Sequence, residues 1–156
     1  MTQVQRALFE AFVAPLIGLP VSHVWQGHGS AIFLEFGALT PTKRRDGSPG
    51  APQGEMGLMI EWSWRMEGRR SILLGSWSDE ARWPRAFACL TKATVAGATT
   101  FGRLPEIDLA LSNGLHVVSL MTAARNPGWA LFDRRREPWR SLYVRTGRLC
   151  VEEAPA

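Results

Sequence analysis

Histidine is the first side chain in this sequence that could do chemistry near neutral pH. His23 and His28 lie five residues apart across a glycine-rich turn, and His116 lies in a later strand. Imidazole groups bind zinc where three or four ligands converge. The sequence has no HExxH-type spacing, and its carboxylates do not cluster around the histidines. The pattern favours structural or surface histidines, and we expect neither a metal nor another cofactor.

Two carboxylates on neighbouring predicted strands are the candidates for a general acid and base. Glu35 and Glu61 both lie on the faces opposite the apolar stripes of their strands, and Arg65 shares the side of Glu61. This placement favours a salt bridge on the face of the strands over catalysis.

The nucleophile candidates lack the surroundings that would activate them. Ser30, Ser63 and Ser112 have no Gly-x-Ser-x-Gly elbow, and Cys89 and Cys150 have no local histidine. The sequence also has no phosphate loop with Gly-Lys-Ser/Thr. We therefore expect that the chain is not an enzyme.

Arginines beside aromatic residues near the C-terminus indicate binding instead. Such a cluster can hold phosphates and stack on bases, and tryptophan with arginine is typical of protein interfaces. The predicted partner-contacting residues are Trp129, Arg134, Arg135, Arg136, Trp139 and Arg140. Asp133 and Glu137 interrupt the cluster, so a solvated turn is the simpler interpretation of its charge. Trp25 and Trp77 also lie near turns, where an exposed ring is a typical protein contact.

Hydrophobic periodicity predicts the elements that position these residues. Thr2 is placed to cap an N-terminal helix that ends at Pro15. Residues alternate afterwards with a period of two, and the strongest alternation runs from Leu58 to Met66. The predicted strands cover 21–26, 31–36, 58–66, 71–75, 95–100, 107–111, 115–119, 129–132, 139–144 and 149–151, with a short linking helix near 84–91.

Residues 38–56 form the longest predicted loop. They contain three prolines, three glycines and the basic run Lys43-Arg44-Arg45, with little apolar content. We expect a flexible surface loop inserted between two strands.

Two segments, 16–66 and 95–121, share a pattern that predicts an internal repeat. Residues 107–111 echo 32–36, and Leu115, Val117 and Ser119 correspond to Leu58, Ile60 and Trp62. One three-stranded meander buries only one face, so two packed copies would form a core. The expected fold is a single α+β domain with an N-terminal helix, two duplicated antiparallel meanders in a sandwich or barrel-like arrangement, the linking helix and a C-terminal hairpin.

Several of these positions match a known pattern. A Gly-x-x-Val stretch leads to a strand ending in Phe36-Gly37, and Trp64-Arg65, a second Gly-x-x-hydrophobic stretch, Asn113-Gly114 and a late Trp-x-Leu follow. The chain thereby resembles small uncharacterised bacterial proteins, some of which are immunity proteins of polymorphic toxin systems. The matching positions span roughly 16–150 and are mainly glycines and core aromatics. The resemblance implies a toxin-neutralising role and assigns no functional residue.

Composition limits the class of protein. The 156 residues are 46% hydrophobic and 21% charged, which excludes a disordered tail, a collagen-like repeat and a coiled coil. Eighteen Lys and Arg against fourteen Asp and Glu give a net charge of +4, which permits binding to nucleic acid. The longest apolar run, 11–21, contains two prolines and is too short to span a bilayer. No signal-peptide pattern and no paired cysteines are present, so we expect a cytoplasmic protein without membrane contact.

The sequence thus predicts a non-catalytic bacterial binding protein that recognises another protein. The alternative is a nucleic-acid-binding domain that uses the arginine-rich C-terminal hairpin. A homodimer in which sheets extend edge to edge is compatible with both interpretations.

Overall fold

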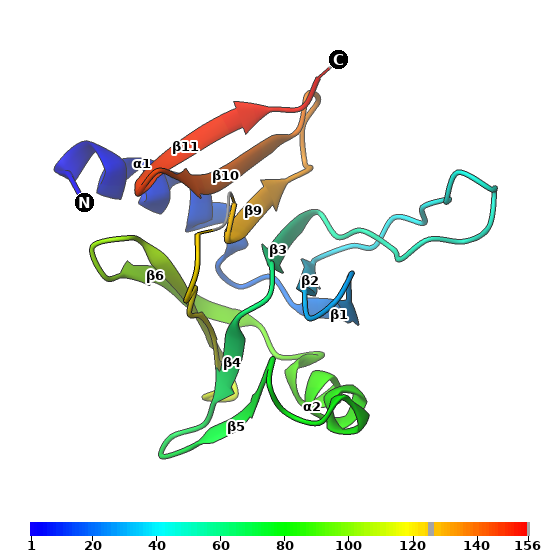
Figure 1. The fold of residues 1–156 in the computed structure, drawn as a ribbon. Coiled ribbons are helices and arrows are strands. Elements are labelled where there is room, and N and C mark those ends of the chain that lie inside the picture. The colour runs from blue at the N-terminus through cyan, green and yellow to red at the C-terminus, as the bar shows by residue number, and fades with distance from the viewer. Residues whose placement is uncertain (125–126, 156) are drawn as a thin grey trace.

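A computed structural model describes residues 1–124 and 127–155 of the chain. The helices are α1 (Gln3–Val13), η1 (Ala14–Leu16), η2 (Glu80–Arg82) and α2 (Trp83–Leu90). The strands are β1 (Val21–Gln26), β2 (Ile32–Phe36), β3 (Met56–Ile60), β4 (Trp64–Glu67), β5 (Ile72–Gly75), β6 (Val95–Phe101), β7 (Glu106–Leu111), β8 (His116–Ser119), β9 (Trp129–Asp133), β10 (Arg140–Arg145) and β11 (Arg148–Glu153). The fold is α+β, as predicted (Figure 1).

Both predicted helices form where the sequence places them. The Thr2 hydroxyl accepts a hydrogen bond from the Gln5 N–H at 3.2 Å, which caps α1. Phe9 and Phe12 are buried on one side of α1. Pro84 occupies the first turn of α2, where its missing N–H costs no helical hydrogen bond.

The strands form two antiparallel sheets, and the chain passes from the first sheet to the second and back again. One sheet has the order β1-β2-β3-β9-β10-β11, and the other has the order β5-β4-β8-β7-β6. The consecutive strands β3 and β4 therefore lie in different sheets, and so do β8 and β9. Neither set of described strands closes into a barrel.

The predicted strand over 58–66 is wrong in one respect, because it is two strands in different sheets. β3 ends at Ile60, and β4 begins at Trp64. Leu58 and Ile60 before the break and Trp64 and Met66 after it are all buried in the core. The alternation of buried side chains in β3 is therefore found again in β4. The linking segment is held by the second crossover: the Glu61 N–H donates to the Gly128 C=O at 2.9 Å, and the Leu120 N–H donates to the Ser63 C=O at 3.0 Å.

The two predicted repeats, 16–66 and 95–121, each contain a three-stranded meander, β1-β2-β3 and β6-β7-β8. If the five strands β1–β5 are matched in order with β6–β10, the two sheets have the same strand order. The remaining strand, β11, is an additional edge strand of the six-stranded sheet. The strand pairing changes the residue correspondence, because Leu34 lies opposite Leu58 whereas Leu109 lies opposite Val117. If Leu34 is matched with Leu109, then Leu58 is matched with Val117. The sequence pattern matches Leu58 with Leu115, two residues earlier. A common origin of the two halves remains a prediction.

Residues 38–56, predicted as a loop, extend from the sheet as a two-stranded arm (Figure 1, cyan). Thr40 and Gln53 exchange backbone hydrogen bonds of 2.7 and 3.0 Å, and Lys43 bridges to Pro49. A turn at 44–48 closes the arm, with the Asp46 carboxylate accepting from the Ser48 N–H. The arm therefore has its own hydrogen bonds, although it lies outside the core.

Candidate functional site

The hairpin of β9 and β10 carries the predicted contact residues and sends them in different directions. Asp133 pairs with Arg140 and Phe132 pairs with Ser141 in the ladder. Because successive side chains of a strand point to opposite faces, Asp133 lies on the same inner face as Leu131. Phe132 lies on the outer face of the six-stranded sheet.

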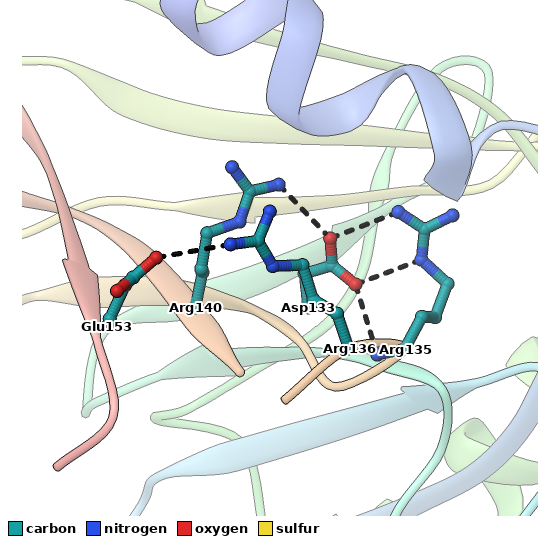
Figure 2. Close-up of polar contacts among 5 residues, drawn as sticks. All are labelled: Asp133, Arg135, Arg136, Arg140 and Glu153. Atoms are coloured by element: carbon teal, nitrogen blue, oxygen red, sulfur yellow. Dashed lines mark hydrogen bonds and ion pairs between the residues drawn. The ribbon is translucent and has the colours of Figure 1, made fainter. Parts of the chain in front are cut away.

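Asp133 is a buried carboxylate that binds two of the predicted arginines (Figure 2). Arg135 donates from its backbone N–H and from Nε to Oδ1, at 3.2 and 2.9 Å, and from Nη2 to Oδ2 at 3.0 Å. Arg140 Nη2 donates to Oδ2 at 3.4 Å. The hydrogen bonds from Arg135 hold the pKa of Asp133 below its ordinary value.

Arg140 joins this network to α1. Its guanidinium carbon lies 5.5 Å from the centre of the Phe12 ring, which is a cation–π distance. The Arg140 guanidinium thus lies between the Asp133 carboxylate and α1. Figure 2 shows the hydrogen-bond network below this helix. This arrangement gives Arg135 and Arg140 a structural role in fastening the hairpin.

Arg134 binds a second buried carboxylate, that of Glu35. Arg134 Nη1 donates to Glu35 Oε2 at 2.9 Å and to the Gly54 C=O at 3.2 Å. The same Oε2 atom accepts from the Gly54 N–H at 2.9 Å. Arg134 reaches Glu35 by crossing Gly57 of β3, where a Cβ atom would lie 2.9 Å from Nη1. The ion pair therefore fixes the root of the arm to the sheet.

Of the two candidate carboxylates, Glu35 forms a salt bridge with Arg134, whereas Glu61 forms no ion pair with Arg65 or any other described residue. Arg65 Nε donates instead to Glu67 at 2.5 Å on the other sheet. Both Glu35 oxygens accept hydrogen bonds within the chain, from Gly54, Arg134 and, at 3.4 Å, Trp25 Nε1.

The remaining predicted contact residues also divide between core and surface. Trp129 is buried, with Nε1 donating to the Pro105 C=O at 2.9 Å, so it is not the exposed ring that the sequence suggested. Its position at the start of β9 directs it into the core beside Phe9. Trp139 is half-buried on the outer face, edge-on to Phe132 at 5.9 Å. Arg136 is exposed and pairs with Glu153 at 3.1 Å.

The six predicted residues are therefore not all exposed. Arg135 and Arg136 are exposed, Trp139, Arg134 and Arg140 are half-buried, and all four arginines hold carboxylates of the chain itself. The sequence suggests a cluster of positive charge in this hairpin. In the folded chain, carboxylates largely neutralise that charge.

The histidines are not brought together. His116 Nδ1 lies 2.7 Å from Asp108 on the five-stranded sheet, whereas His23 lies on β1 of the other sheet. Across residues 1–124 and 127–155, no group of three or more His, Cys, Asp or Glu residues could hold a metal ion.

A cleft of about 490 Å³ lies where the β6–β7 and β10–β11 turns meet. Its walls include Leu104, Met121, Trp129 and Val144, with Glu106 as the charged residue. Both Glu106 oxygens accept hydrogen bonds, one from Ser119 Oγ and one from the Met121 N–H. The carboxylate is therefore occupied by the protein itself.

Sequence reasoning placed Trp77 near a turn as a candidate contact, but it missed the exposed apolar residues that precede it on β5. Trp77, Ile72 and Leu73 are 86%, 60% and 40% exposed, on β5 and the turn that follows it. β5 is an edge strand. The signal in the sequence is the run Ile72-Leu73-Leu74, which breaks the alternation, so apolar side chains lie on both faces of a strand that buries only Leu74.

The chain matches no family model, no curated protein and no solved structure. No helix in the described part of the chain is long and apolar enough to cross a membrane.

Proposed function

We propose that this chain is a non-catalytic binding protein whose partner is another protein, contacted through β5 and Trp77. The observation that carries the proposal is the exposure of Ile72 and Leu73 on an edge strand and of Trp77 in the turn that follows it. Clustered apolar side chains at a surface mark interaction sites, and tryptophan is the residue most enriched among interface anchors.

The edge position of β5 supports the same proposal. A strand edge that carries apolar side chains is a template for association, and proteins that do not use such an edge protect it with charge or proline. Ile72 and Leu73 provide no such protection. Arg69 and Arg70 in the preceding turn are exposed, so the apolar group has a cationic border.

Affinity capture from cells that contain the natural partner tests this function. Trp77→Ser should remove the captured protein while leaving the melting temperature within about 2 °C, because an exposed side chain contributes little to the fold. Leu104→Ser is the matched control, since Leu104 is 72% exposed on the β6–β7 turn, at the opposite end of the sheet from β5. Equal capture by wild type and Trp77→Ser would contradict the proposal.

The resemblance noted above makes a toxin the partner of choice. The product of a neighbouring toxin-like reading frame should stop growth when expressed alone, and co-expression of this chain should restore growth. Trp77→Ser should abolish the protection. A captured second copy of the chain would instead identify a homodimer through the same edge.

Nucleic-acid binding is the second candidate, and the arm is the observation that favours it. Lys43, Arg44 and Arg45 are exposed and form no ion pair with any described residue, in contrast to the arginines of the C-terminal hairpin. Phosphate contacts by such cations release counterions, so affinity for a DNA duplex should fall steeply with the logarithm of salt concentration. A protein interface anchored by Trp77 should respond little to salt.

A further inference from the structure

A groove of about 480 Å³ lies between the outer edge of β1 and helix α2. β1 from Ser22 to Gln26 forms one wall. Trp83, Pro84, Phe87 and Ala88 make the opposite wall largely apolar. Figure 1 shows α2 lying alongside β1 at the end of the molecule away from β11. The groove therefore has a strand edge on one side and an apolar helix on the other.

The outer edge of β1 presents unpaired backbone groups to this groove. β1 is the terminal strand of its sheet and pairs only with β2. The Gly27 N–H donates to the Ala31 C=O at 2.8 Å, which closes the β1–β2 hairpin. Because backbone groups alternate in direction along an antiparallel strand, Trp25 faces β2, whereas Val24 and Gln26 face away from it. In the part of the chain that the structure describes, no other backbone group hydrogen-bonds to their outward edge.

A segment of the chain itself pairs with the start of β1 but does not extend along the rest of the strand. The Val21 N–H donates to the Ala93 C=O at 2.8 Å, and the Lys92 N–H donates to the Val21 C=O at 2.9 Å. Pro20 and Thr94 form an antiparallel bridge in the same segment. Lys92, with φ of 75°, follows α2 and turns the chain into this alignment, so the segment before Lys92 is helical and does not pair with β1. The next position along the sheet, beside Val24 and Gln26, is where an added strand would continue.

We propose that this groove binds an extended peptide segment of a partner protein, which adds to the sheet beside β1 as a further strand. The N–H and C=O groups of Val24 and Gln26 supply hydrogen bonds to the peptide backbone, as in other complexes formed by strand addition. Alternate side chains of the peptide pack against Pro84 and Phe87, so the segment carries apolar residues at every second position. His23 and Glu80 are the titratable residues of the groove, and Glu80 favours a basic residue at one end of the peptide.

This site is separate from the surface around Trp77. β1 ends the six-stranded sheet, whereas β5 ends the other sheet. The groove can therefore be tested whether or not Trp77 contacts a partner, and Trp77→Ser should leave peptide binding unchanged.

A phage-displayed library of random twelve-residue peptides, selected on the full chain, provides the probe. An enriched peptide should bind Gln26→Ala as well as wild type and bind Gln26→Pro about tenfold more weakly, because proline removes one outward N–H and its hydrogen bond. The two variants lose the same side-chain contact, from Gln26 Nε2 to the Gly29 C=O. Ala88→Trp, which fills the groove from α2, should also abolish binding. No enriched peptide, or equal binding by the proline and alanine variants, would overturn the proposal.

Hydrogen exchange of the wild-type protein gives a readout that needs no variant to fold. The bound peptide should slow exchange of the Val24 and Gln26 amides and leave the Trp25 amide, already paired with β2, unchanged. Protection confined to other strands would place the peptide elsewhere and refute the groove as its site.

Discussion

Two buried carboxylates decide what the arginines of the C-terminal hairpin do. Glu35 and Asp133 are buried, and each is held by arginines from the run 134–140. The sequence shows that arginines and carboxylates are present, and its alternation correctly places Glu35 opposite the apolar face of its strand. It does not show that Arg134 is the partner of Glu35, because the two lie 99 residues apart and meet only through the pairing of β3 with β9.

Arg134→Ala should lower the free energy of unfolding by about 3–5 kcal/mol, because it leaves the buried Glu35 carboxylate without its cation. Arg136→Ala is the matched control. It removes an exposed ion pair with Glu153 and should cost less than about 1 kcal/mol. Urea denaturation of both variants measures the difference. Equal, small losses would show that the Glu35 pair is not a stabilising contact.

Asp133→Asn should destabilise the fold by about 2–3 kcal/mol at neutral pH and should change its pH dependence. The pKa of Asp133 is lowered in the folded chain, so the unfolded state binds the proton more tightly. The stabilisation is therefore complete well above pH 4 and is lost as pH falls through the lowered pKa. Denaturation curves from pH 7 to 2 should show the gap between wild type and variant closing below about pH 4. A gap that stays constant to pH 2 would refute the linkage.

Among the elements, the strand that crosses between sheets shows a limit of pattern reading. Period-two alternation places Leu58, Ile60, Trp62, Trp64 and Met66 on one face, and all of these except the half-buried Trp62 are buried. Ser63, which the alternation places on the opposite face, is buried as well. Alternation carries no information about which sheet a strand joins, because both sheets bury the same face toward one core. The break at Glu61–Ser63 is set by hydrogen bonds to the distant segment 120–128.

The arm has backbone pairing that its composition does not indicate. Its glycines and prolines are typical of loops, but its backbone is paired from Thr40 to Gln53. These two residues exchange both hydrogen bonds, which is the closing geometry of a two-residue hairpin. Replacing 41–52 by Asn-Gly should therefore leave the melting temperature within about 3 °C, because residues 41–52 include no buried core residue.

The same replacement separates the two candidate functions. It should abolish binding to a DNA duplex if the arm cations hold phosphates, and it should leave capture of a protein through Trp77 unchanged. Calorimetric melting and electrophoretic mobility shifts provide the two measurements. A large loss of stability would show instead that the arm supports the fold.

On the scale of the whole molecule, two sheets with matching strand order share one core and exchange strands. Each sheet ends in strands whose outer edges are not covered by another sheet, and the exposed apolar residues of β5 lie at one of these ends. The predicted helices, meanders and hairpin give most of the elements. The exposure of Ile72 and Leu73 was not predictable, because it depends on which large side chains the packed sheets leave outside.

Photocrosslinking from position 77 in the native host is the most direct measurement of protein binding through β5. A benzophenone amino acid at position 77 should form an adduct of defined mass with a partner protein or with a second copy of the chain. The same group at position 104, where Leu104 is 72% exposed at the opposite end of the five-stranded sheet from β5, should form none. No adduct from position 77, or the same adducts from both positions, would contradict the account.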